Sequence, residues 1–76
     1  MKLESMRLKL DGIRLEHDAE NVERFLNYLE GVHEVSVDVL SGFLYATYDA
    51  HEVSVSDVED SLRFLGYAPH EQFEHA

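Results

Sequence analysis

The sequence predicts an α+β domain whose elements follow the order βαββαβ. Two kinds of apolar pattern lead to this fold class. In several short runs apolar residues alternate with polar ones, which is the period of half-buried strands. In two longer segments they recur every three or four positions, which is the period of amphipathic helices. No linker or low-complexity stretch interrupts the 76 residues, so we expect one small domain.

The first strand and the first helix follow from these patterns. Residues 6–11 alternate between apolar and polar side chains, and Gly12 ends this strand. We expect Asp18 to be the N-cap of a helix that extends to about Glu30 and is stopped by Gly31. The apolar stripe of this helix consists of Val22, Phe25, Leu26 and Leu29.

A hairpin comes next. The stretch "VHEVSVDVLSGFLYATYD" contains two alternating runs around a turn at residues 40–42. Alternation assigns the helix-facing side of the second run to Leu44, Ala46 and Tyr48. The open side of the sheet then carries Phe43, Tyr45 and Thr47. The first run is expected to lie at an edge, where Glu34 and Asp38 would discourage uncontrolled pairing.

The second helix has two candidate starts. Ser54 and Asp57 have the spacing of a capping box. Ser56 and Glu59 have the same spacing, so both starts stay open at this point. Gly66 is expected just beyond the end of the helix. The apolar side of the helix is formed by Val58, Leu62 and Leu65.

A short final run, "YAPHEQF", completes the element order, and Pro69 suits only an edge strand. Two interleaved βαβ-like halves in this order predict a ferredoxin-like sandwich, a four-stranded antiparallel sheet with both helices on one face. The domain is expected to span residues 1–76, with a core of about residues 6–70 and loose N- and C-terminal ends.

Composition excludes several classes of function. The net charge of −10 opposes binding to nucleic acid and to anionic membranes. The sequence contains no cysteine, so neither disulfides nor thiolate metal sites can form. No apolar run is long enough to cross a bilayer, and we expect a cytoplasmic protein. No glycine-rich phosphate loop or nucleophile pair is present, so we do not expect an enzyme.

From residue 8 to residue 68 the chain resembles the heavy-metal-associated domain family of copper chaperones and metal-pumping ATPases. "LKLDGI" is similar to the first strand of that family, and "VERFLNYLEGVHEVSVDVLSG" to its first helix and second strand. "YDAHEVSVSDVEDSLRFLGY" is similar to its second helix with the flanking turns. The resemblance implies the same βαββαβ fold and a role in metal homeostasis.

The metal motif of the family is missing. Where that family has a methionine and a Cys-x-x-Cys pair, this sequence has Ile13, Leu15 and Asp18. Soft Cu(I) prefers sulfur ligands, so cuprous chemistry is not expected here. The same loop carries Glu16, His17 and Asp18, whose side chains suit a divalent ion such as Zn, Ni or Co. The alternative is that Asp18 caps the helix while its two neighbours are solvated.

A second set of candidate ligands is expected at the opposite end of the domain. The connection from the first helix to the second strand and the connection from the third strand to the second helix both lie at that end. His33, Asp49 and His51 are therefore expected to be neighbours. Glu34, Glu52 and, if the tail folds back, His75 would join them. Ordinary solvated histidines are the alternative, because a specific site needs three or four convergent ligands.

The open face of the sheet offers an alternative function. Phe43 and Tyr45, flanked by Arg7, Lys9 and Glu34, are expected to form an apolar patch with a charged rim. Such a patch, or the edge strand, would suit a homodimer or a protein partner. Ordinary cross-strand packing would also explain the two aromatic residues. The sequence therefore leaves two functions open, divalent metal binding without thiols and protein interaction without metal.

Overall fold

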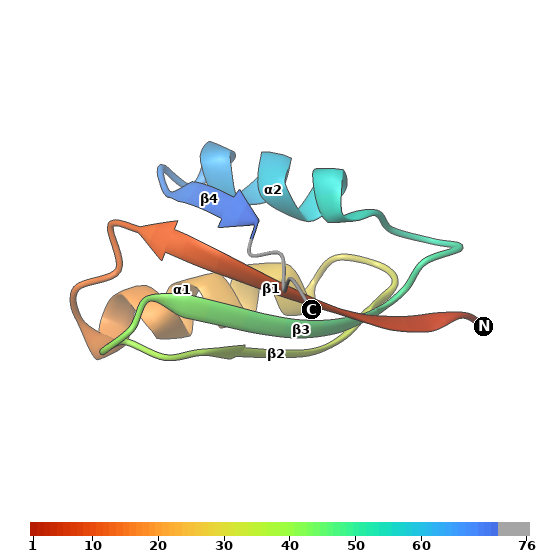
Figure 1. Cartoon of the computed structure of the whole chain (residues 1–76), viewed down its shortest axis with the longest axis horizontal. Coiled ribbons are helices and arrows are strands. Elements are labelled where there is room, and N and C mark those ends of the chain that lie inside the picture. The colour runs from red at the N-terminus through yellow and green to blue at the C-terminus, as the bar shows by residue number, and fades with distance from the viewer. Residues whose placement is uncertain (72–76) are drawn as a thin grey trace, which may run out of the picture.

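The computed structural model describes residues 1–71, so Gln72 and Phe73 of the expected last strand and the candidate ligand His75 lie outside the described residues. Its strands and helices appear in the predicted order (Figure 1). Their bounds are β1 Leu3–Asp11, α1 Glu16–Asn27, β2 Val32–Val37, β3 Phe43–Asp49, α2 Val55–Phe64 and β4 Ala68–Glu71.

The four strands form one antiparallel sheet in the order β2-β3-β1-β4, and both helices cover the same face of it (Figure 1). This arrangement confirms the ferredoxin-like α+β prediction. The strands β2 and β4 are the edges, as expected from the hairpin and from Pro69. The face of the sheet opposite the helices has no covering layer among residues 1–71, and we call it the open sheet face.

The core lies between the sheet and the helices. Its six largest fully buried side chains are Leu8, Val22, Leu26, Leu44, Val58 and Leu62. Burial of such a side chain contributes about 1.5–3 kcal/mol, so this layer supplies much of the free energy of folding. Along β3 the alternation is as predicted, because Leu44, Ala46 and Tyr48 are buried. Tyr45, on the other side of the strand, is 46% exposed.

The first strand begins at Leu3, three residues before the predicted start. The sequence predicted a loose N-terminal end. Leu3 and Glu4 instead pair with the end of β3, so this part of the N-terminus is ordered in the sheet. The cause is non-local. The Lys2 backbone N–H donates to the Asp49 carboxylate at 3.1 Å, and the Lys2 carbonyl accepts from the Ala50 N–H at 2.8 Å.

Helix α1 ends at Asn27, earlier than the predicted Glu30. Hydrogen bonds from the Tyr28 and Leu29 N–H groups reach only three residues back, which closes the helix in a tight turn before Gly31. Gly31 has a φ of +95°, and a Cβ there would lie 2.8 Å from Glu52 Cβ. This glycine therefore permits the close approach of the loop after β3 rather than stopping the helix directly.

The start of α2 is settled in favour of Ser54. Its hydroxyl accepts from the Asp57 N–H at 3.1 Å, and the Asp57 carboxylate accepts from the Ser54 N–H at 2.9 Å. These reciprocal bonds form a capping box and satisfy two N–H groups at the helix start. Gly66 follows the end of the helix with a φ of +97°, as predicted. None of the helices within residues 1–71 is long and apolar enough to span a membrane.

Candidate functional site

The loop between β1 and α1 corresponds to the expected metal loop, and its N-cap prediction was wrong. Leu15 is the N-cap of α1, and Asp18 lies within the first turn of the helix. The Asp18 Oδ2 atom accepts from the Arg14 and Leu15 N–H groups, at 3.0 Å each. A leucine side chain has no acceptor for the N–H groups at the helix start. The Asp18 carboxylate stabilises this end of the helix instead, by accepting from the backbone that precedes it.

The second oxygen of Asp18 is also engaged. Its Oδ1 atom accepts from the Tyr67 hydroxyl at 3.0 Å, which ties the loop to the connection between α2 and β4. Hydrogen bonds from the Arg14 and Leu15 backbone, and then from Tyr67, hold the pKa of Asp18 below its ordinary value. Burial, followed by the bond to Asp18, raises the pKa of Tyr67. Both carboxylate oxygens therefore already stabilise the loop.

The remaining positions of the loop do not assemble a ligand set. Leu15, at the place of the first cysteine, is an apolar side chain that is 66% exposed. Glu16 and His17 are exposed on the first turn of α1. Throughout residues 1–71, no three side chains of His, Cys, Asp or Glu lie close enough to hold a metal ion together. Metal binding by Glu16, His17 and Asp18 stays a prediction, and it would require rearrangement of the loop.

The second candidate cluster has a structural carboxylate at its centre. Asp49 is the one buried charged residue among those described, and it is 7% exposed. Its Oδ1 atom accepts from the His51 N–H at 3.0 Å and from the Lys2 N–H at 3.1 Å. These two bonds, the first being the stronger cause, hold the pKa of Asp49 below its ordinary value. The side chains of His33 and His51 are exposed, and their binding of a metal also stays a prediction.

On the open sheet face, the two predicted aromatic residues contact each other and two cations. The rings of Phe43 and Tyr45 have centroids 6.2 Å apart. The Arg7 guanidinium carbon lies 5.4 Å and the Lys9 Nζ atom 5.2 Å from the centroid of Phe43. Both distances are within the range of cation–π interactions. We call the group formed by Arg7, Lys9, Phe43 and Tyr45 the cation–aromatic patch.

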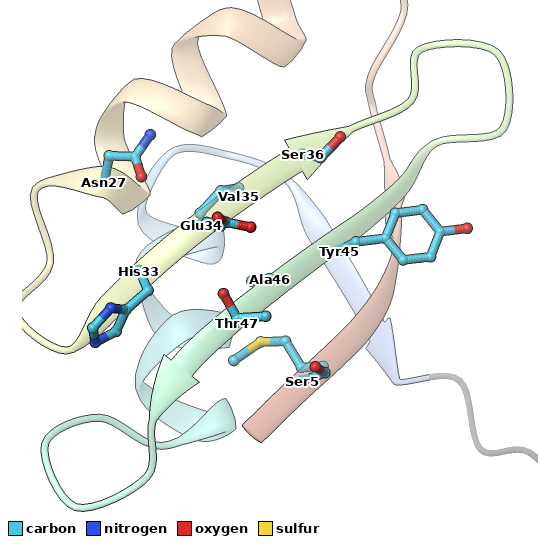
Figure 2. A pocket seen from close by; sticks show the side chains of 10 residues that line it. Ser5, Asn27, His33, Glu34, Val35, Ser36, Tyr45, Ala46 and Thr47 are labelled. Atoms are coloured by element: carbon cyan, nitrogen blue, oxygen red, sulfur yellow. The ribbon is translucent and has the colours of Figure 1, made fainter. Parts of the chain in front are cut away.

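A depression of about 570 Å³ adjoins this patch. Figure 2 shows the side chains around it, with Tyr45 on one side of β3 and His33 at the start of β2. Ser5, Ser36 and Thr47 supply hydroxyl groups to its lining, and Glu34 supplies a carboxylate. The lining therefore combines hydroxyl groups and a carboxylate with the ring of Tyr45, along neighbouring positions of β2 and β3.

The free edge of β2 is partly closed by a side chain from α1. Glu23 Oε2 accepts from the Val37 N–H at 2.8 Å, which occupies a backbone donor at an edge of the sheet. A bulge between Val32 and Glu34 also interrupts the regular register with β3. Both features reduce uncontrolled pairing with another strand, a protection that the sequence had led us to expect from charged side chains alone.

An aromatic group on the helices was not predicted from the sequence. The rings of Phe25 and Phe64 stack with centroids 6.3 Å apart, and Phe64 is 81% exposed. Tyr28, which is 84% exposed, helps to line a groove of about 320 Å³ beside them. One signal for this group was available in the sequence. Tyr28 and Phe64 lie outside the apolar stripes of their helices, at positions where polar residues are usual.

Comparisons with known proteins place the fold among small metal-handling domains. The copper chaperone CopZ of Bacillus subtilis is 32% identical over 65 residues, which cover 86% of this chain and 94% of CopZ. A zinc-transporting ATPase of Synechocystis sp. is 32% identical over 65 residues, but these are only 9% of its length. The solved structure of a CopZ metallochaperone matches with a TM-score of 0.85 and 28% identity, covering 88% of this chain and 100% of that one. No family model matches the chain.

Proposed function

This chain belongs to the heavy-metal-associated domain family that includes the copper chaperone CopZ, and on that premise we propose that it is a protein-interaction module of metal homeostasis that holds no metal in its loop. The names of its relatives, a copper chaperone and a zinc-transporting ATPase, support the physiological setting. The residues of the loop support the loss of metal binding.

The observation that carries this proposal is that both oxygens of Asp18 already accept hydrogen bonds. Its two oxygens accept three hydrogen bonds within the loop and from Tyr67. A metal ion that used this carboxylate would have to displace some of these bonds or share an oxygen with them. Leu15 offers no donor atom, and the sequence has no cysteine that could supply a thiolate. The loop is thus held by hydrogen bonds to a carboxylate, at the position that corresponds to the second cysteine of the family motif.

Divalent metal binding is the second candidate, and one observation favours it. His17 is exposed beside Glu16 on the first turn of α1, directly before Asp18, so its imidazole is accessible to an ion in solution. A Zn, Ni or Co ion held by these side chains would have to draw further ligands from water, because the described residues supply no third convergent group. The exposed pair His33 and His51 has the same limitation.

Thermal melts of chelator-stripped protein separate the two candidates. A ligand that binds only the folded state raises its stability by RT ln(1 + [L]/Kd), so a real site gives a shift that grows with metal concentration. We expect no shift with Zn, Ni, Co or Cu(II) at low micromolar excess. A rise abolished by His17→Ala would contradict the proposal and locate a metal at the loop. A rise that persists in His17→Ala and is lost in the variant His33→Ala/His51→Ala would place it at the opposite end.

The interaction half of the proposal has its own readout. Immobilised protein should capture the same partners with and without chelator, because no metal bridges the contact. A variant that carries Phe43→Ala and Tyr45→Ala should lose them, whereas Tyr28→Ala, which removes an exposed aromatic ring from the helix side, should retain them. Capture that depends on added metal, or that is equal in all three proteins, would refute an interaction through the open sheet face.

A further inference from the structure

We infer that the open sheet face binds an acidic, extended segment of a partner protein, with Arg7 and Lys9 receiving its carboxylates over the ring of Phe43. This inference rests on the proposed interaction function and adds the chemistry of the partner. It concerns the open sheet face and not the loop between β1 and α1, and it uses neither Glu16, His17 and Asp18 nor the pair His33 and His51.

The register of the sheet builds the cation–aromatic patch. Arg7 is paired with Tyr45, and Lys9 with Phe43, across the two central strands β1 and β3. Because both pairs lie on the side of the strands opposite the buried residues, all four side chains emerge on the open sheet face. Lys9 is also held by a hydrogen bond from its Nζ atom to the Ser41 carbonyl. Central strands give these groups a rigid support, which lowers the entropy lost on binding.

Charge complementarity identifies the partner as acidic. The chain has sixteen Asp and Glu residues and only six Lys and Arg residues. Two of those six, Arg7 and Lys9, lie together in the patch. Asp11, the neighbouring acidic side chain, is engaged by His70, whose Nε2 atom lies 2.9 Å from its Oδ2 atom. An acidic partner is therefore repelled by most of the surface and attracted here, which fixes where it docks and favours a correct orientation.

The adjoining depression extends the binding surface along β3. Beyond Tyr45 it offers the hydroxyls of Ser5 and Thr47, and the carboxylate of Glu34 lies on the β2 side (Figure 2). A bound segment would therefore place its carboxylates at the Phe43 end and donor-bearing or apolar side chains toward the depression.

The test uses synthetic peptides and the intact chain. The probe alternates Glu and Leu residues, and its counterpart carries Lys in place of every Glu. Binding is followed by changes in backbone amide NMR signals and by the Kd at low and moderate salt. We expect the Glu peptide to shift signals of β1 and β3 and to bind more weakly as salt rises, because ion pairs at a surface are screened. The Lys peptide should not bind at this face.

The matched variants are Arg7→Gln/Lys9→Gln and Arg14→Gln/Arg24→Gln. Both change the net charge equally, but the second pair lies in the metal loop and on α1, away from the patch. Loss of two partly exposed ion pairs should weaken binding of the Glu peptide by roughly tenfold in the first variant. The second variant should bind like the parent chain. Circular dichroism of both variants checks that they are folded.

Several results would overturn the inference. These are equal weakening in the two variants, equal binding of the Lys peptide, or no binding of the Glu peptide at low salt. Binding of single-stranded oligouridine at the same face would assign it to nucleic acid, and association of the chain with itself that is lost in Arg7→Gln/Lys9→Gln would assign it to a second copy. A metal-dependent melt would refute the proposed function without changing these peptide results, so the two failures can be distinguished.

Discussion

Replacing Glu23 by alanine tests how the domain protects its free edge. The Glu23 carboxylate lies on α1 and accepts from the Val37 N–H at 2.8 Å, across a separation of 14 residues. Val37 is 9% exposed, so its N–H has little access to water when the carboxylate is removed. A hydrogen bond to a charged group contributes about 1.5–3 kcal/mol, and the low end applies at a sheet edge that water can reach after a small rearrangement.

We therefore expect Glu23→Ala to lower the free energy of unfolding by about 1.5 kcal/mol. For a domain of this size, each 1 kcal/mol corresponds to a fall of roughly 4–8 °C in Tm. Thermal melts followed by circular dichroism measure the change. Amide exchange at Val37 should be faster in the variant, and sedimentation at rising concentration should show more association through the exposed edge.

Two further variants separate the hydrogen bond from general effects of charge and helix propensity. Glu20→Ala makes the same substitution on the same helix at an exposed position, and it should leave the Tm nearly unchanged. Glu23→Gln keeps a neutral acceptor and should fall between the parent and Glu23→Ala. An unchanged Tm in Glu23→Ala, or an equal loss in Glu20→Ala, would refute the reasoning that this carboxylate closes the edge.

Three other outcomes follow from the structure. Backbone hydrogen bonds are the main cause that holds the pKa values of Asp18 and Asp49 below their ordinary value of 3.8. Both carboxylates therefore stabilise the folded state above pH 3.8, and this contribution is lost as the pH falls through their pKa values in the folded protein. The Tm should consequently drop steeply below pH 3.8, and less steeply in Asp18→Asn; parallel curves would contradict this. The variant Leu15→Cys/Asp18→Cys should gain Cu(I) binding, measured by competition with a chromophoric chelator, because thiolates at a helix N-terminus are stabilised and Cu(I) prefers sulfur. Binding no tighter than that of Leu15→Cys alone would show that the loop cannot hold two thiolates. Ser54→Ala should lower the free energy of unfolding by about 1 kcal/mol through loss of the N-cap, whereas Ser56→Ala, one residue inside the helix start, should have little effect in the same melts.

The hydrogen bonds to Asp18 have a consequence for the loop between β1 and α1. In this chain Asp18 satisfies the Arg14 and Leu15 N–H groups directly. Hydrogen bonds within the chain therefore hold this loop, and no ion is needed to satisfy these two backbone groups.

The sequence by itself determined the element order and the faces of the strands and helices. These features depend on local periodicity, because a strand or a helix reveals its buried side through residues two, three or four positions apart. The faces of β3, the aromatic pair Phe43 and Tyr45 on the open sheet face, and the edge positions of β2 and β4 followed from that rule. The absence of cysteine was equally plain, and it excludes thiolate chemistry in any fold that the chain could adopt.

Only the tertiary structure decided what the polar side chains do. The sequence placed Asp18 at the N-cap of α1, but its carboxylate reaches back to Leu15 and binds Tyr67, which is 49 residues away in the chain. It placed Asp49 among metal ligands, but this residue ties the N-terminus to the end of β3. A carboxylate has the same chemistry as a cap, a ligand or a tether, and its role depends on which donors the fold brings within about 3 Å of its oxygens. Local patterns specify burial, whereas these distances arise only when segments far apart in sequence pack together.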